Sequence, residues 1–133
     1  MKKLFISLFI FITFIKADAI HSKLHEKIFE GIFPNNKEIL IYNIGNPTYK
    51  FKNIKYTKEI YKSNIIFISE YYRIHIINNK PIFASSLFQL KYYKNAIGAL
   101  YWNKGKAEII LLKDRLKEHN LKVADYLEKY IIE

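Results

Sequence analysis

The chain has 133 residues, half of them hydrophobic, so it is long enough for one domain with a buried core and too apolar for a disordered chain. Its formal net charge of +10 makes nucleic acids and anionic membranes candidate partners. Because the sequence contains no cysteine, disulfides, thiolate metal ligands and a lipid-modified N-terminal cysteine are excluded.

The first 19 residues have the order of parts that protein export requires. A basic start at 1–3 precedes an uncharged apolar run over 4–15, and residues 17–19 (ADA) give the small-x-small pattern that signal peptidase prefers. The run is shorter than the roughly 20 apolar residues that span a bilayer. We therefore predict a secretory signal peptide over 1–19, cleaved near Ala19. An uncleaved membrane anchor is the main alternative, and a buried amphipathic helix is the third.

Whether the chain is exported determines which partners its positive charge can attract. A cleaved signal peptide would place the remaining domain, residues 20–133, in the periplasm, away from DNA and RNA. We therefore expect no nucleic acid as a partner and, after cleavage, no stable insertion into the membrane. The heavy use of Lys, Ile, Asn and Tyr is also typical of an AT-rich genome, which accounts for part of the charge.

The domain opens with a segment of helical periodicity, Ile20–Phe33. Apolar side chains recur at Leu24, Ile28 and Ile32, and Phe29 widens the same stripe. The Pro-Asn-Asn sequence that follows ends the predicted helix.

Short apolar segments rich in β-branched and aromatic residues then predict strands. The clearest are Glu38–Ile44 and Asn64–Ser69, whose near-continuous apolar runs suit a sheet covered on both faces, and Pro81–Ala84 is a third. Between the first two, a short strand near Phe51–Tyr56 and a helical turn near Thr57–Tyr61 are weaker predictions.

The segment before and after Pro81–Ala84 mixes strand, turn and helix signals. Arg73–Ile77 is apolar and β-prone, and a turn over residues 78–81 follows it. After the strand, Ser85 and Ser86 are placed to cap a short helix over Leu87–Tyr93.

A hairpin is predicted from Ala96–Trp102 and Ala107–Leu112, two strand-like runs joined by Asn103–Lys106. Asn and Gly in so short a connection tolerate the positive φ of hairpin turns. The lysines fall in the turn, where they are solvated, so a core hairpin is favoured over a nucleic-acid-binding ribbon. We expect Trp102 to be a structural anchor.

Two helices are predicted after the hairpin. Lys113–Asn120 would turn Leu116 inward, and Val123–Ile131 would form a terminal helix with Leu127 and Ile131 on one stripe. Strands that alternate with helices predict an α/β fold: a small mixed sheet of four or five strands with an antiparallel hairpin and flanking helices.

The histidines do not predict a metal site. His21 and His25 are four residues apart and could share a helix face, as two metal ligands do, but they begin two residues after the predicted cleavage point, in a segment expected to fray. His75 alternates with isoleucines, which favours the outer face of a strand. His119 lies among charges at a helix end, where a cation is favoured.

No residue pattern in the sequence predicts a catalytic site, so we expect neither enzymatic activity nor a cofactor. Ser85 and Ser86 lack the glycine-flanked elbow of a hydrolase, and four dispersed glycines do not form a phosphate-binding loop. The acidic pairs lie beside lysines at helical spacing, as solvated surface pairs do. Residues 45–47 (GNP) follow a strand and could shape a ligand pocket at its carboxyl end, although a simple turn is the plainer interpretation.

Taken together, the order of these features resembles the YfiR/HmsC-like periplasmic family. The segments that carry the resemblance are the signal peptide, the helix ending in Phe33-Pro34, ILIYNIG (39–45), SNIIFIS (63–69), PIFASS (81–86), NAIGALYWNKGKAEIILL (95–112) and LKVADYLEKYI (121–131). The resemblance implies a small α/β protein that controls a membrane-bound diguanylate cyclase by binding its periplasmic sensor domain, and so affects cyclic di-GMP and biofilm formation. The chain is short for the family and lacks the cysteines that some members use, so redox control is not implied.

Three hypotheses for function follow. The first is a non-enzymatic periplasmic protein that binds a partner, a membrane sensor or diguanylate cyclase. Tyr71, Tyr72, Tyr92 and Tyr93 are candidate contacts, because two tyrosines in series put one ring on each side of a strand and exposed tyrosine is favoured at interfaces; the alternative is that they cover the core edge. The second is a small periplasmic ligand-binding module with a pocket near Gly45 and Ser85. The third is a basic protein that associates with anionic lipid or envelope polymers.

Overall fold

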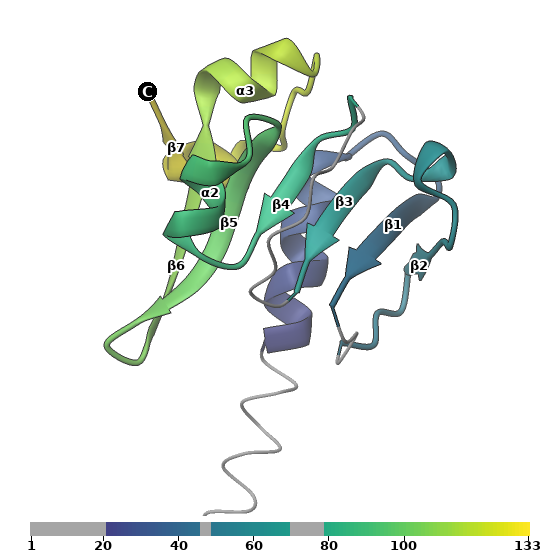
Figure 1. The fold of residues 1–133 in the computed structure, drawn as a ribbon, viewed down its shortest axis with the longest axis horizontal. Coiled ribbons are helices and arrows are strands. Elements are labelled where there is room, and N and C mark those ends of the chain that lie inside the picture. The colour runs from purple at the N-terminus through teal and green to yellow at the C-terminus, as the bar shows by residue number, and fades with distance from the viewer. Residues whose placement is uncertain (1–20, 46–48, 70–78) are drawn as a thin grey trace, which may run out of the picture.

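A mixed α/β fold is observed in the computed structural model, which describes residues 21–45, 49–69 and 79–133 (Figure 1). Within these residues one sheet has seven strands, so the prediction of four or five is wrong. The predicted signal peptide and the predicted strand at 73–77 lie outside the described residues. Over the described part of the chain, no helix has both the length and the apolar character needed to cross a membrane.

The sheet joins a parallel part to an antiparallel hairpin. Its strands, in spatial order β2-β1-β3-β4-β5-β6-β7, are parallel from β2 to β5, while β6 runs antiparallel to β5 and β7 parallel to β6. The bounds are β1 Ile39–Ile44, β2 Ile54–Tyr56, β3 Ile65–Ile68, β4 Ile82–Ala84, β5 Ala96–Asn103, β6 Lys106–Leu112 and β7 Ile131–Ile132. The predicted strands in these regions are thereby confirmed.

Both faces of the sheet are covered, which explains the continuous apolar runs. Successive side chains of a strand point to opposite faces, so Phe67 joins one apolar cluster while Ile66 and Ile68 join another, and all of β3 is buried. The first helix (21–32) covers one face, and α2 (Leu87–Tyr92) lies against the other (Figure 1).

The first helix follows the predicted periodicity. Ile28, Phe29 and Ile32 are almost fully buried in the cluster on its side of the sheet. Its Glu26 makes a contact that periodicity does not predict: one carboxylate oxygen accepts backbone N–H hydrogen bonds from Lys52 and Asn53, both 3.0 Å long. The helix therefore also holds the loop that leads into β2.

The hairpin is confirmed, but its turn is shifted from the prediction. The residues with positive φ are Lys104 (φ 51°) and Gly105 (φ 79°), whereas Asn103 is still paired with Lys106. The connection is thus a tight two-residue turn. Trp102 is 47% exposed near the end of β5, and its ring stacks on that of His21 with centroids 5.3 Å apart.

The C-terminal region departs most from prediction. α3 (Lys113–Glu118) is present and buries Leu116 as expected. The predicted terminal helix is instead the 3-10 helix η2 (Asp125–Tyr130), followed by β7. A 3-10 helix has about three residues per turn, so Leu127 and Ile131 do not share a stripe. Leu127 enters the core, while Ile131 pairs with β6 across from Leu111.

Smaller elements complete the fold. The turn predicted before β3 is the short 3-10 helix η1 (Ile60–Lys62). Ser86 caps α2 as predicted, because its hydroxyl oxygen accepts a hydrogen bond from the Gln89 N–H.

Candidate functional site

The carboxyl ends of the parallel strands are tied together by polar side chains. The hydroxyl of Ser69 donates to the carbonyl oxygen of Ile44 at 3.2 Å, and the hydroxyl of Ser85 donates to that of Ile68. Since β1 lies between β2 and β3, this is where the strand order reverses, a common position for ligands in open α/β sheets. Here Ser85 acts as a structural tie between β3 and β4.

The pocket expected near Gly45 and Ser85 is found only in part. A shallow cavity of about 280 Å³ includes Gly45 but not Ser85. It is lined by Tyr42, Asn43, Gly45, Tyr56, Thr57 and Lys58. The side-chain amide of Asn43 donates to the Gly45 carbonyl oxygen at 3.1 Å, and the buried Oδ1 of Asn43 accepts no hydrogen bond within the described residues.

The candidate tyrosines are placed differently from one another. Tyr71 and Tyr72 lie outside the described residues. Tyr92 is in the last turn of α2 and Tyr93 is its C-cap, so this pair lies at a helix end and not on a strand. Tyr92 is 45% exposed, whereas Tyr93 is buried in the core, as the alternative reading of the pair expected.

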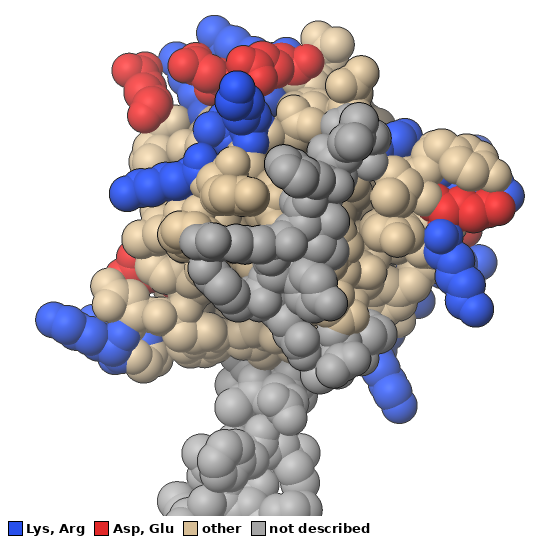
Figure 2. Space-filling model, in the orientation of Figure 1, with Lys and Arg blue, Asp and Glu red and all other residues tan. Residues whose placement is uncertain are grey.

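The outer side of α2 exposes large apolar side chains, and we call Leu87, Phe88 and Tyr92 the α2 face. Each of the three is 42–45% exposed, and the rings of Phe88 and Tyr92 are stacked with centroids 5.9 Å apart. The charged residues from the start of α2 to the start of β5 are the exposed Lys91 and Lys94. Figure 2 shows uncharged surface over α2 with basic side chains beside it.

His25 is a buried histidine, which corrects the expectation of a frayed segment. It is 1% exposed, and its Nδ1–H donates to the His21 carbonyl oxygen at 2.9 Å. Its Nε2 accepts no hydrogen bond within the described residues, and its ring packs against those of Tyr49 and Phe67. Burial lowers the pKa of His25 to about 4, so the ring is neutral at pH 7.

The His21 ring lies beside that of His25, with centroids 4.8 Å apart, and stacks on Tyr49 and Trp102. Across the described residues, no three His, Asp or Glu side chains come together as a metal ion would require. His119 is the C-cap of α3, and partial burial lowers its pKa.

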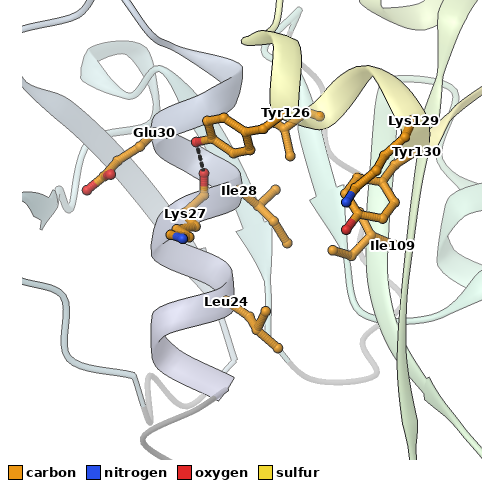
Figure 3. A pocket seen from close by; sticks show the side chains of 9 residues that line it. Leu24, Lys27, Ile28, Glu30, Ile109, Tyr126, Lys129 and Tyr130 are labelled. Atoms are coloured by element: carbon orange, nitrogen blue, oxygen red, sulfur yellow. Dashed lines mark hydrogen bonds between the residues drawn. The ribbon is translucent and has the colours of Figure 1, made fainter.

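A larger cavity lies between the first helix, β6 and η2, and we call it the tyrosine groove (Figure 3). Its volume is about 490 Å³, within the range of small-molecule sites. The apolar part of its lining consists of Leu24, Ile28, Ile109 and Leu127. Figure 3 shows Ile28 of the helix and Ile109 of β6 pointing toward one another across the cavity.

Two tyrosines and three charged residues form the rim of the tyrosine groove: Lys27, Glu30, Tyr126, Lys129 and Tyr130. The hydroxyl of Tyr126 donates to the Lys27 carbonyl oxygen at 2.6 Å. Burial, together with the nearby Glu30 carboxylate, raises the pKa of Tyr126, so its hydroxyl keeps the proton that it donates. The ammonium of Lys129 lies 5.2 Å from the centroid of the Tyr130 ring.

Sequence reasoning missed the tyrosine groove and, apart from Tyr92, the α2 face. The groove brings together side chains from three distant segments, which no local pattern reports. The α2 face did have a signal, because four of the six residues of this short helix are large and apolar, more than one buried side can take.

Comparisons with known proteins support the fold and do not identify a family. No protein-family model matches the chain, and no curated protein matches it either. The crystal structure of a conserved domain protein from Vibrio cholerae is similar with a TM-score of 0.50 and 12% sequence identity. The match covers 83% of this chain and 58% of that chain, so this chain spans less than two thirds of its neighbour's length. At this identity the likeness shows a shared fold alone.

Proposed function

We propose that the chain is an exported, non-enzymatic binding protein that regulates a membrane sensor, such as a membrane-bound diguanylate cyclase, by binding the sensor's periplasmic domain. The resemblance to the YfiR/HmsC-like family supports this proposal. The observation that carries it is the α2 face, where three large apolar side chains of one short helix are exposed together.

The chemistry of the α2 face defines the partner surface. Large aromatic side chains are enriched at the centre of protein interfaces, and an exposed cluster of them marks a docking surface more often than isolated apolar residues do. Lys91 and Lys94 border the face and carry the same charge. The partner surface should therefore be an apolar depression with acidic side chains at its rim.

Photo-crosslinking in the producing cell tests the proposal. A photoreactive residue at Phe88 or Tyr92 should capture the periplasmic domain of one integral membrane protein. The same residue at Tyr61, which is 69% exposed on η1 in another part of the molecule, should not (Figure 1). Equal capture from all three positions, or none from Phe88 and Tyr92, would contradict the proposal.

Binding and signalling then test whether the captured domain is the regulated partner. Phe88→Ser should weaken binding of the purified domain at least about tenfold, since it removes a large aromatic side chain from the interface centre. It should also change cellular cyclic di-GMP in the same direction as deletion of the gene. Tyr61→Ser is the matched control and should leave both unchanged. Normal binding and normal cyclic di-GMP in the Phe88→Ser strain would overturn the assignment.

A second candidate function, a small-ligand-binding module, is favoured by the tyrosine groove. The groove is larger than the cavity at Gly45, with about 490 Å³ against about 280 Å³. A ligand-binding role would therefore be centred on the first helix and η2, away from the predicted position near Gly45 and Ser85.

A further inference from the structure

The lining of the tyrosine groove separates apolar from charged groups. Leu24, Ile28 and Ile109 are aliphatic and form its inner surface, with Ile28 only 2% exposed. Lys27 and Lys129 are exposed, and they flank the opening from the helix side and from the η2 side (Figure 3). The groove thus offers aliphatic contacts inside and two positive charges at the opening.

The acidic member of the lining does not cancel these charges at the opening. Glu30 belongs to the rim, but in Figure 3 its carboxylate points away from Ile28 and Ile109. No salt bridge within the described residues involves Lys27, Lys129 or Glu30. Lys129 lies over the Tyr130 ring, a weak contact that leaves its ammonium able to meet an anion.

We propose that the tyrosine groove binds a linear acyl chain that ends in an anionic group. The chain would lie on Leu24, Ile28 and Ile109, where burial of each methylene contributes roughly 0.8 kcal/mol. The anionic end would lie at the opening, between Lys27 and Lys129. The site is separate from the α2 face, because Ile28 and Leu127 belong to the apolar cluster on one side of the sheet and Leu90 of α2 to the cluster on the other.

Decanoate, used below its micelle concentration, is the probe. Titration of the purified mature protein should shift the methyl NMR signals of Leu24, Ile28 and Ile109, with saturation below about 1 mM. Neutral 1-decanol should bind more weakly, because it lacks the charge that the lysines attract. A lysophospholipid with an anionic headgroup distinguishes a lipid source from a free fatty acid, since it should compete only if the opening admits a larger head.

Substitutions locate the site. Lys27→Gln and Lys129→Gln should each weaken decanoate binding by about threefold, and the salt dependence of binding should fall with them. Leu24→Trp should fill the groove and weaken binding by more than about tenfold. Lys23→Gln removes an exposed charge from the same helix outside the lining and should change nothing.

Two outcomes would overturn the proposal. One is the absence of methyl shifts up to about 1 mM decanoate. The other is equal affinity in the wild type, in Leu24→Trp and in the Lys27→Gln/Lys129→Gln double variant, with folding of each verified by its methyl spectrum. Neither outcome bears on crosslinking from the α2 face, so this proposal and the proposed function fail independently.

Discussion

The hydroxyl of Tyr126 donates a hydrogen bond of 2.6 Å to the main-chain oxygen of Lys27, a residue 99 positions earlier in the chain. A second bond joins the same segments, since the N–H of Ala124 donates to the Gly31 carbonyl oxygen at 2.7 Å. These bonds fix the C-terminal 3-10 helix to the first helix, and so keep together the two walls of the tyrosine groove.

Tyr126→Phe should lower the free energy of unfolding by about 1 kcal/mol, because it removes one hydrogen bond and leaves the ring in place. Urea denaturation measures the change. Tyr130→Phe is the matched control: it lies on the same rim and makes no hydrogen bond through its hydroxyl that is seen in the described structure, so it should change stability by less than half as much. Equal effects of the two substitutions would mean that the bond to Lys27 does not stabilise the fold.

Gly31→Ala should destabilise the protein although alanine favours helices. A Cβ at this position would stand 2.5 Å from Cδ1 of Leu127 and 2.7 Å from the Tyr126 hydroxyl. Overpacking of this kind typically costs about 1–3 kcal/mol, against a gain of about 1 kcal/mol in helix propensity. We therefore expect a net loss of stability in chemical denaturation.

A double-mutant cycle separates this clash from other effects of the added methyl group. Leu127→Ala is itself destabilising, because Leu127 is 2% exposed, but it removes the atom nearest to the new Cβ. In that background Gly31→Ala should cost less stability than in the wild type, and the remaining cost should come from the contact with the Tyr126 hydroxyl at 2.7 Å. The same penalty in both backgrounds would show that the two positions do not interact.

Arg115 connects α3 to the turn between α2 and β5. Its Nη1 donates to the carbonyl oxygens of Tyr93 at 2.7 Å and Ala96 at 2.9 Å. Arg115→Met keeps most of the apolar stem but leaves these acceptors without the charged donor, so stability should fall by about 2–3 kcal/mol. Thermal and urea unfolding measure the loss.

Two further variants test whether donor geometry is the cause. Arg115→Lys retains the charge and should recover part of the lost stability, since one ammonium is a poorer match to several carbonyls than a guanidinium. Lys117→Met removes an exposed charge from the same helix and should be nearly neutral. If Lys117→Met costs as much as Arg115→Met, the effect comes from charge alone.

The buried His25 predicts a pH-dependent stability. Its pKa is about 4 in the folded protein, below the ordinary value of about 6.5 that applies when the chain is unfolded. Between these values the unfolded chain binds a proton that the folded chain does not, so stability falls as the pH is lowered from about 6.5 to about 4. The whole window amounts to about 3 kcal/mol, and below it the loss levels off.

His25→Phe should remove this part of the pH dependence, because phenylalanine fills the aromatic environment and does not titrate. Urea denaturation at several pH values between 4 and 7 measures it. His119→Gln is the control and should retain the His25 contribution, although burial also lowers the pKa of His119. An unchanged pH profile in His25→Phe would show that His25 does not remain neutral in the folded state.

Sequence patterns correctly predicted those helices and strands whose signal lies within the element itself. The first helix has a stripe at helical spacing, the strands around Ile41 and Phe67 are apolar on both faces, and the serine before α2 caps it. Each of these signals lies within one element, so periodicity and capping rules suffice.

The C-terminal segment could not be predicted in the same way. Leu127 and Ile131 are spaced for an α-helix, yet Ile131 pairs with Leu111 of β6, which lies 20 residues earlier in the chain. Tertiary pairing overrode the local preference there. Both border strands are short: β2 was only a weak prediction and β7 was not predicted, which is why the strand count was too low.

The sequence predicted the candidate site only where its residues belong to one short segment of the chain. Tyr92 was singled out from sequence and is exposed, but its neighbour Tyr93 is buried because α2 ends between them and the chain turns inward. The tyrosine groove depends on the first helix meeting η2 at Gly31, and neither segment alone indicates that contact.

The two border strands of the sheet have a consequence for how another protein can be recognised. β7 has two residues and pairs with β6 only at Leu111 and Leu112, so the outer side of β6 over residues 106–110 has no strand beside it within the described residues. This stretch is the part of the sheet border to which an extended segment of another protein can be added, as in domains that capture extended peptides. Recognition at this border would depend on main-chain register, whereas recognition by the α2 face depends on the shape and chemistry of side chains.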